Sequence, residues 1–337
     1  MVKSHSPFFS VIIPTRNRPA LFELALNSVL SQHFEDKEVI VVNDGSDDEY
    51  VTQYEAIIEK HANVTFYSLV QRANGHGQSY SMNFGAQAAK GEYLCFLDDD
   101  DYWTDDAYLT RANNNLLGKR IDLYYSNQKA FFSDGTQNES NVWIEDLIEK
   151  KEFILKENNS AYPVDTQTLL DSQGFAHLNC SIFKRDFYQY IGGMDENIRY
   201  ECDRDIYIRS IDKADYILYD PAFVSYHNIP DKNDDKNMST AVTVFEKRLY
   251  QLRVYEKGIL HSVRSEIIQH CRYGKSVQFK FIAEAFAEQG KYHRAFSYAW
   301  QALADGFSIK WLLYCHYLAG RKLFSHKSHS AAIEEGR

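Results

Sequence analysis

The stretch "EYLCFLDDDDYW", residues 92–103, places four consecutive aspartates, Asp98–Asp101, directly behind a short apolar run. The apolar run predicts a buried strand, and the like charges at its end repel one another without benefit to the fold. An acidic surface turn is one interpretation of such a cluster. The other is a site for a hard divalent cation, because carboxylate oxygens are the ligands that Mg²⁺ and Mn²⁺ prefer.

The residues before this stretch alternate between predicted strands and helices. Apolar runs at 8–14, 37–44 and 92–97 predict strands, and apolar residues at helical spacing between them predict helices. This order is typical of βαβ units in a parallel sheet, where ligands bind beyond the carboxyl ends of the strands. The polar clusters "PTRNRP" (14–19), "NDGSDD" (43–48) and Asp98–Asp101 all follow strands. We therefore expect them to share one site.

The rest of the chain is less regular and then helical. Runs at 122–132 and 177–185 predict two further strands with long polar connections. From residue 241 the pattern is helical, and two helices joined at "EQGKY" (288–292) resemble a single tetratricopeptide-type hairpin. We expect an α/β domain over residues 1–240, a helical region over 241–325 and a disordered tail over 326–337.

Charge is distributed unevenly along the 337 residues, whose net charge is −10. Residues 241–330 contain 14 Lys and Arg against 6 Asp and Glu, whereas the remainder of the chain carries about −18. The five cysteines show no CxxC spacing, which favours reduced thiols in a cytoplasm. We expect no membrane span, no signal peptide and no nucleic-acid partner.

Four motifs in order resemble the family 2 glycosyltransferases, which have the GT-A fold. They are "SVIIPTRNRP" (10–19), "VIVVNDGSDD" (39–48), "AAKGEYLCFLDDDDYW" (88–103) and "GGMDENIRYECDRDIYIR" (192–209). The resemblance implies a Rossmann-like, mostly parallel sheet flanked by helices over residues 8–240. It also implies an inverting, metal-dependent transfer of a single sugar from a nucleotide-diphosphate sugar, expected to be a UDP-sugar. The expected acceptor is a hydroxyl of a glycan or lipid-linked glycan in cell-surface polysaccharide biosynthesis.

The resemblance also implies which residues bind the donor. Asp44 would accept a hydrogen bond from the nucleobase, although Asp-Gly is a turn former in its own right. Met82 stands where the family has an arginine, so one phosphate contact of the family is in doubt. The residues expected on the donor side are Pro14, Thr15, Arg16, Asp44, Gly45, Arg72, Asn83, Asp98 and Asp99.

A divalent metal, Mn²⁺ or Mg²⁺, is the cofactor that the acidic cluster implies. Asp100 is the expected direct ligand and Asp101 supports it, although a run of four aspartates leaves the register ambiguous by one. His227 is a further candidate ligand, because histidine binds Mn²⁺ readily. His177 and Asn179 are expected on the acceptor side, and a hydrogen-bonded core histidine is an equally good interpretation of His177.

The proton acceptor is expected in "ECDRD" (201–205), which resembles the family's Glu-Asp-x-Asp pattern. Asp203 would be the general base and Asp205 a supporting acid, with Arg209 as its partner. Cys202 occupies the usual glutamate position, and a slip of one residue would make Glu201 the base. A base at this place implies direct displacement with inversion.

Two other functions fit parts of the sequence. A non-catalytic scaffold would act through the helical hairpin, and a sugar-phosphate nucleotidyltransferase would need a glycine-rich loop that "PTRNRP" does not provide. The helical region is expected to touch an anionic membrane through its basic residues, placing a cytoplasmic enzyme at the inner face of the membrane, and a homo-oligomer is expected. These basic residues are Lys247, Arg248, Arg253, Lys257, Arg264, Arg272 and Lys275.

Overall fold

The computed structural model describes residues 6–61, 63–156, 158, 160–231 and 242–334, with side chains as far as residue 323. The chain divides into two compact units, Met1–Ala241 and Val242–Arg337. The domain boundary predicted between residues 240 and 241 lies outside the described residues. Within the described ranges, none of the helices combines the length and apolar character needed to cross a bilayer.

The first unit is built on one sheet, which has nine strands among the described residues. The strands are β1 (Phe9–Thr15), β2 (Lys37–Asn43), β3 (Val64–Ser68), β4 (Tyr93–Phe96), β5 (Tyr102–Trp103), β6 (Leu123–Phe131), β7 (Tyr162–Val164), β8 (Ser181–Lys184) and β9 (Ile217–Asn228). Their order is β3-β2-β1-β4-β8-β6-β9-β5, and β7 pairs with β9.

The two halves of this sheet differ in strand direction. The ladders among β1 to β4 are parallel, as is the ladder between β6 and β9. In contrast, β8 runs antiparallel to β4 and β6, and β5 and β7 run antiparallel to β9. The predicted α/β class is confirmed, and the antiparallel ladders lie where the sequence pattern loosens.

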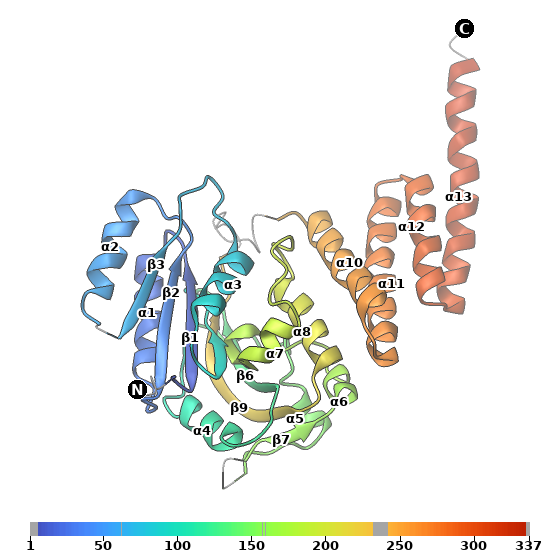
Figure 1. Ribbon diagram of the computed structural model, residues 1–337. Coiled ribbons are helices and arrows are strands. Elements are labelled where there is room, and N and C mark those ends of the chain that lie inside the picture. The colour runs from blue at the N-terminus through green and yellow to red at the C-terminus, as the bar shows by residue number, and fades with distance from the viewer. Residues whose placement is uncertain (1–5, 62, 157, 159, 232–241, 335–337) are drawn as a thin grey trace. The chain divides into compact units, whose positions relative to one another are not determined.

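Helices cover both faces of the sheet (Figure 1). On one face, Val11 packs in a core with Phe22, whereas on the other a Cβ on Gly85 would lie 2.5 Å from a methyl group of Ile12. The alternation of side chains along β1 therefore buries it on both sides. The helices of this unit are α1 (Pro19–Leu30), α2 (Asp48–Ile58), α3 (Gln78–Ala88), α4 (Tyr108–Leu116), α5 (Leu147–Lys150), α6 (Thr166–Leu170), the 3₁₀ turn η1 (Leu178–Cys180), α7 (Arg185–Tyr190) and α8 (Cys202–Lys213).

β1 extends one residue beyond the end that the sequence predicts. Pro14 has no N–H to donate, and the strand was therefore expected to stop there. The Thr15 carbonyl accepts from Asp44 on the β2 side, so residue 14 faces β4, whose pairing with β1 ends at Ile12. No donor is needed at residue 14, and the proline is accommodated inside the strand.

Both strands predicted in the looser region are present. The run 122–132 contains β6, and the run 177–185 contains β8. The first part of the second run is the turn η1, and the His177 side chain accepts a hydrogen bond from the Asn179 N–H. This turn brings residues 177–179 to the end of β4, where the Asn179 amide oxygen accepts from the backbone of Asp98.

The second unit is helical. Its helices are α10 (Val244–His261), α11 (Ser265–Glu288), α12 (Tyr292–Asp305) and α13 (Ile309–Glu334). The predicted hairpin corresponds to α11 and α12, which pack through the buried small residues Ala283, Ala295 and Ala299. α13 extends to Glu334 and so enters the segment 326–337 that the sequence predicts to be a disordered tail.

Candidate active site

The carboxyl ends of the strands bring the predicted polar clusters to one edge of the sheet. Thr15, at the end of β1, donates from Oγ1 to Asp99 Oδ2 over 2.7 Å. His227, near the end of β9, places Nδ1 2.7 Å from Asp101 Oδ2. The Asp98–Asp101 cluster after β4 is therefore shared between two strands that are distant in the sequence. Ligands of α/β sheets bind at this edge.

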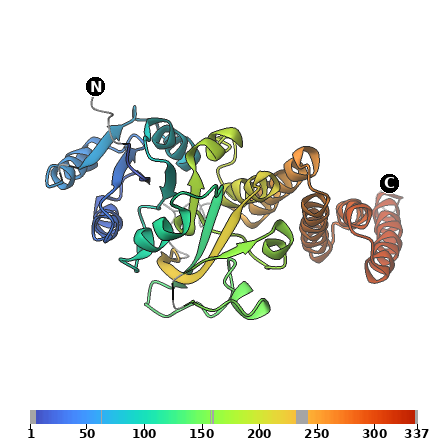
Figure 2. The same ribbon diagram turned by 60° about the horizontal axis from the view of Figure 1, so that its bottom comes forward.

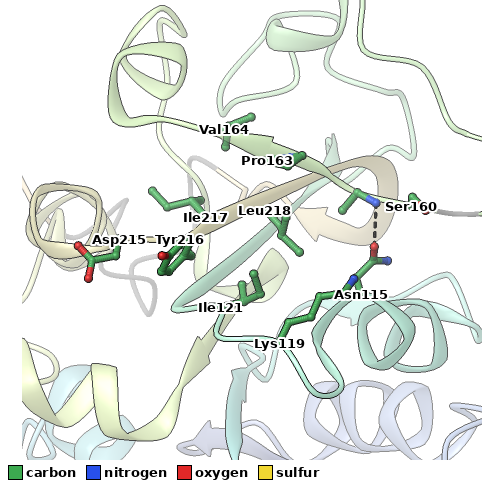
Figure 3. Close-up of a pocket in the computed structure, with 11 residues that line it drawn as sticks. Asn115, Lys119, Ile121, Ser160, Pro163, Val164, Asp215, Tyr216, Ile217 and Leu218 are labelled. Carbon is green, nitrogen blue, oxygen red and sulfur yellow. Dashed lines mark hydrogen bonds between the residues drawn. The ribbon is translucent and has the colours of Figure 1, made fainter.

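A different pocket, of about 330 Å³, opens near the opposite end of β9 (Figure 3). It is lined by Asn115 in the last turn of α4, by Lys119 in the segment after this helix, and by Ile217 and Leu218 from the start of β9. None of the residues predicted for the site contributes to it, so we do not assign the donor to this pocket.

Arg18, from the "PTRNRP" cluster, pairs with two of the four aspartates. Its Nη2 lies 2.7 Å from Asp99 Oδ1, and its Nη1 lies 2.7 Å from Asp100 Oδ2. Burial lowers the pKa of Arg18, but the neighbouring carboxylates outweigh burial and raise it. The sequence analysis did not single out Arg18, although a second arginine in a polar cluster after the first strand was a signal for it.

The remaining two aspartates turn away from Arg18. Asp98 Oδ1 accepts from the Gln78 amide over 2.5 Å. Asp101 is buried and accepts from the side chain of Asn179, the His227 ring and the backbone of Asn228. The run of four aspartates therefore faces in more than one direction, with Asp99 and Asp100 toward β1 and Asp101 toward β9.

The negative charges of the cluster are only partly balanced by Arg18. Burial raises the pKa of Asp98 well above its usual range, and the carboxylates of Asp203 and Asp100 raise it further. Burial likewise raises the pKa of Asp99 to about 6, although Arg18 opposes this. Asp98 and Asp99 thus hold their protons more tightly than in water, which means that a further cation would be favourable here. An oxygen-rich cluster with excess negative charge fits a hard divalent metal.

Two histidines border the cluster with different ring orientations. Among the described residues, Asp98, Asp101 and His177 offer ligand atoms that all lie within 4.8 Å of one another. His177 Nδ1, however, accepts from the Asn179 N–H, so its proton resides on Nε2. His227 directs Nδ1 at the Asp101 carboxylate, which leaves the lone pair on Nε2. A carboxylate on the far nitrogen is the usual support of a metal-binding histidine.

Burial also separates the charge states of these histidines. Burial and, to a smaller extent, the nearby His227 together lower the pKa of His177 to about 3, so the ring is neutral at pH 7. Burial lowers the pKa of His227 as well, but the Asp101 carboxylate overcomes this and raises it. Trp143 packs edge-on against both rings, with centroids 5.7 Å from His177 and 5.2 Å from His227. The sequence analysis missed Trp143, because a lone tryptophan in an irregular segment gives no signal.

Asp203, in the first turn of α8, faces the aspartate cluster across His177. Its Oδ2 lies 3.7 Å from His177 Nε2, and Asp98 Oδ2 lies 3.9 Å from the same nitrogen. Asp203 Oδ1 is buried and has no hydrogen-bond partner. Burial raises the pKa of Asp203 to about 7, and the Glu201 carboxylate also raises it. The group has the proton affinity that suits a general base near neutral pH.

The other two acidic residues of "ECDRD" are held by arginines. Glu201 precedes α8 in a left-handed conformation with φ 67°, and Arg204 Nε donates to it over 2.6 Å. Asp205 is buried and accepts from Arg209 Nε over 2.8 Å. Arg209 also donates to two backbone carbonyls in the turn before α8, at Ile191 and Gly193. Asp203 is the carboxylate of this segment whose contacts with His177 connect it to the aspartate cluster.

The turn after β2 is shaped by Asp44 and Gly45. Asp44 accepts from the backbone and ring of His76 and from the Gly77 N–H, at 2.8, 2.9 and 2.9 Å. Gly45 has φ 63°, and a Cβ there would lie 2.7 Å from the Val70 carbonyl. The glycine is thus required by both conformation and space. The hydrogen bonds from His76 and Gly77 to Asp44 hold the loop at residues 70–77 against the carboxyl end of β2.

The other expected donor residues have varied surroundings. Arg16 donates to the carbonyls of Arg72 and Ala73, which connects the two loops. Pro14 lies inside β1. Asn83 uses its amide within the protein, where it bonds Met194, Glu196 and Tyr188. The expected phosphate contact of Asn83 stays a prediction, and its described role is to connect α3 with the turn before α8.

Comparison with solved structures identifies the class of fold. The chain superimposes on S. aureus TarS 1-349 in complex with UDP-GlcNAc with a TM-score of 0.63 and 18% identity, covering 98% of this chain and 92% of that one. It also matches the mannosyltransferase PcManGT from Pyrobaculum calidifontis in complex with GDP-Man and Mn²⁺, with a TM-score of 0.58 and 16% identity, over 95% and 81% of the two chains. The fold is that of a GT-A glycosyltransferase.

Sequence comparison narrows this class to a family. Residues 10–192 match the model of glycosyl transferase family 2, which is more than half of the chain. The chain therefore belongs to glycosyl transferase family 2 and is a transferase, as the four motifs predicted.

Relatives with curated names match over part of their length. A Campylobacter jejuni GalNAc(5)-diNAcBac-PP-undecaprenol beta-1,3-glucosyltransferase is 30% identical over 50% of this chain and 55% of its own. An uncharacterized glycosyltransferase of Haemophilus influenzae is 24% identical over 64% of each chain. This chain thus spans less than two thirds of the length of these relatives.

Proposed function

We propose that the protein transfers a single sugar, with inversion, from a UDP-sugar to a hydroxyl of a glycan or lipid-linked glycan. The observation that carries this proposal is the approach of Asp203 and Asp98 to one nitrogen of His177, at 3.7 and 3.9 Å. A proton acceptor and the acidic cluster that faces the diphosphate then border the same space. Direct displacement needs this arrangement, because the acceptor hydroxyl must lose its proton as the diphosphate departs.

The proposed choice of uracil is supported by the hydrogen bonds of Asp44. A carboxylate offers about four lone-pair sites, and His76 and Gly77 occupy three of them. One site remains for a single N–H, which uracil presents at its imide nitrogen. Guanine presents two adjacent donors and would have to displace the loop. The complex of TarS with UDP-GlcNAc is consistent with this choice.

The proposed metal is Mn²⁺ or Mg²⁺, with Asp100 and His227 Nε2 as ligands. Asp101 would orient His227 through its Nδ1, and Asp98 would complete the oxygen-rich wall. The metal would supply Lewis acidity that neutralises the charge developing on the diphosphate. Arg18 already neutralises Asp99 and Asp100 in part and would remain beside the phosphate oxygens.

Asp203 is the proposed general base. Its carboxylate would take the proton of the acceptor hydroxyl as the oxygen attacks the anomeric carbon from the side opposite the nucleotide diphosphate. The bond from that carbon to the diphosphate breaks in the same step, so the configuration inverts. Glu201 is the weaker candidate because Arg204 holds its carboxylate. Asp205 is proposed to support α8 through Arg209.

The acceptor and the cellular place of the reaction are also proposals. The relative from Campylobacter jejuni acts on an undecaprenol-linked glycan according to its name, which supports a lipid-linked acceptor and surface-polysaccharide synthesis. We therefore propose a cytoplasmic enzyme at the inner face of the membrane, with residues 1–240 as the catalytic domain and 241–325 as a helical region that meets the membrane. A homo-oligomer remains a prediction from the sequence.

A screen of nucleotide-sugars tests the proposed function. The purified protein is incubated with UDP-, GDP- and dTDP-sugars, with and without Mn²⁺, and the released nucleotide is measured. We expect slow, metal-dependent hydrolysis of one or more UDP-sugars, because water can replace the acceptor. Hydrolysis of GDP-sugars alone would contradict the role of Asp44, and turnover unaffected by metal chelation would contradict the metal site.

A further inference from the structure

α13 carries apolar side chains on two opposite faces. Trp311, Cys315 and Leu318 are buried in the core of the second unit. On another face, Ile309, Leu313 and Leu323 are 70%, 66% and 69% exposed, and Tyr317 is 52% exposed. Positions 309, 313, 317 and 323 are spaced by i+4, i+8 and i+14, so they fall on one side of a helix. We call these four residues the outer stripe of α13.

The side chains of the outer stripe are mostly exposed, and the contacts of Tyr317 within α13 are with Tyr314 and Arg321. α13 lies at the end of the row of helices, and α12 is the helix beside it (Figures 1 and 2). In a stack of helical repeats, the last helix normally has a polar outer face that keeps the stack soluble. Here the outer face is apolar, so it is suited to contact with another surface outside this unit.

The charge of α13 indicates which kind of surface binds the outer stripe. Residues 306–333 contain no aspartate or glutamate, whereas they include Lys310, Arg321, Lys322 and Lys327. On a helical projection Lys310 and Arg321 fall along one edge of the outer stripe. A second copy placed on this stripe would bring Lys310 and Arg321 against the same cations of its partner, because residues 306–333 contain no acidic side chain to pair them. An anionic surface is the complementary occupant.

Basic residues of α13 also contact aromatic rings of the neighbouring helix α12. The Arg321 guanidinium lies 4.6 Å from the ring centroid of Tyr292 and 5.9 Å from that of Tyr317. Lys322 lies 5.3 Å from the ring centroid of Phe296, which stacks on the half-exposed Trp300. Tyrosine and tryptophan beside arginine and lysine are the side chains that proteins place at the headgroup level of a bilayer.

We infer that the outer stripe of α13 docks the protein on an anionic lipid bilayer. The apolar side chains enter the boundary between headgroups and acyl chains, and Lys310 and Arg321 contact the lipid phosphates. The inference deepens the proposed function, because it names the surface that would hold the enzyme near a lipid-linked acceptor, but docking itself requires no catalysis.

The docking surface differs from the basic residues that the sequence analysis expected. Lys275 pairs with Glu256 at 2.8 Å and with Asp305 at 3.2 Å, so its charge is used within the unit. Arg248 donates to Gln278 and lies 4.1 Å from the ring centroid of Phe281. These contacts reduce the positive charge of that side, whereas no salt bridge is found for Lys310 or Arg321 among the described residues.

Flotation of the full chain with vesicles tests the inference. Vesicles of phosphatidylcholine containing 30% phosphatidylglycerol are compared with pure phosphatidylcholine at low and physiological salt. Leu313→Asp is expected to lower binding to the anionic vesicles at least about tenfold, and Arg321→Gln about fivefold, since each basic residue near the surface contributes about 1 kcal/mol. Binding of the wild type is expected to weaken as salt rises.

Matched variants in the first unit serve as controls. Leu24 on α1 is 57% exposed, and the Arg120 side chain is 75% exposed. Leu24→Asp and Arg120→Gln are expected to change vesicle binding less than twofold. Equal effects of Leu313→Asp and Leu24→Asp would overturn the inference. So would sedimentation that shows Leu313→Asp dissociating an oligomer of the wild type in the absence of lipid.

The outcomes for docking and for catalysis can be told apart. Leu313→Asp is expected to retain the metal-dependent hydrolysis of nucleotide-sugar measured without vesicles. If hydrolysis is absent from the wild type but vesicle binding follows the pattern above, the proposed function fails and the docking surface stands. If hydrolysis is present and no anionic vesicle is bound, the docking surface fails alone.

Discussion

The two halves of the sheet differ in how the carboxylates of the candidate site are hydrogen-bonded. In the parallel half, β1 to β4, the carboxylates at the strand ends are engaged: Asp44 accepts three hydrogen bonds, and Asp99 contacts Thr15 and Arg18. In the mixed half, Asp203 Oδ1, on the helix α8 between β8 and β9, is buried without a hydrogen-bond partner among the described residues, whereas the unpartnered buried atoms of the parallel half belong to Arg16 and Ser81 rather than to a carboxylate. Native proteins satisfy nearly all buried polar groups, so such exceptions need a cause.

This difference indicates that the two halves of the sheet have separate roles in the candidate site. On the proposed function, the parallel half receives the nucleotide, and its groups are held in position before anything binds. The mixed half receives the acceptor, whose hydroxyl would give Asp203 Oδ1 the hydrogen bond that it lacks. Substitutions in the mixed half should therefore reduce activity at little cost in stability, whereas those in the parallel half should reduce stability.

Asp203→Asn is expected to have the largest effect. It removes the base and should lower transfer about 10³-fold, within the range that general bases contribute. UDP binding, measured by calorimetry, should stay within about twofold of the wild type, since Asn is isosteric with Asp and lies outside the nucleotide turn. Glu201→Gln is the matched control and should lower the rate of transfer less than tenfold. If Glu201→Gln has the larger effect, the base is Glu201 and not Asp203.

The same variant should be more stable than the wild type at high pH. Burial raises the pKa of Asp203 in the fold to about 7, from 3.8, so the ionised carboxylate opposes folding. The wild type thus loses stability as pH rises between these values, and Asp203→Asn should not. Its melting temperature, measured without metal, should exceed that of the wild type more at pH 8 than at pH 5. An equal difference in melting temperature at both pH values would show that the pKa of Asp203 is not raised in the folded protein.

The two histidines offer a matched pair for the metal site. His227→Gln should weaken Mn²⁺ binding about 10- to 100-fold, because it removes a supported ligand nitrogen. His177→Gln should keep an N–H near Asp203 and leave Mn²⁺ affinity within about threefold. Calorimetry or the electron paramagnetic resonance of Mn²⁺ measures both. The reverse order would favour the ligand group of Asp98, Asp101 and His177.

Two glycines with similar backbone conformations test the rigidity of the parallel half. Gly45 and Gly118 have φ of 63° and 69°, but a Cβ at Gly118 meets nothing within 4 Å. Gly118→Ala should cost about 1 kcal/mol of unfolding free energy for the left-handed conformation alone. Gly45→Ala should cost about 3 kcal/mol, because its Cβ also meets the Val70 carbonyl. Urea unfolding measures both unfolding free energies. Equal losses would mean that the turn at Gly45 relaxes to accommodate the added Cβ.

Asn83→Ala should reduce stability less than Gly45→Ala. It removes the amide that connects α3 to the turn before α8 and should cost about 1 to 2 kcal/mol of unfolding free energy. UDP binding should be unchanged, because the amide is used within the protein. A loss of UDP affinity above fivefold with unchanged stability would instead support the phosphate contact that the family resemblance implies.

The sequence predicts the parallel half better than the mixed half for a physical reason. Strands such as 8–14 are buried on both faces and separated by short connections, so the apolar pattern locates both the strands and the polar residues at their ends. In the mixed half, Trp143 and His177 reach the site from irregular segments whose positions depend on tertiary contacts. The direction of each aspartate was also unpredictable, because it is set by Arg18, Asn179 and His227 rather than by position in the run.

The bridge from Arg18 to Asp99 and Asp100 has one more consequence. It gives the site a built-in counter-ion, so part of the electrostatic repulsion is relieved whether or not a cation is bound. In zinc fingers, by contrast, the binding energy of the metal is the folding energy. Chelation should therefore abolish the proposed metal-dependent activity reversibly without unfolding the protein, and the melting temperature should fall only by the contribution of metal binding.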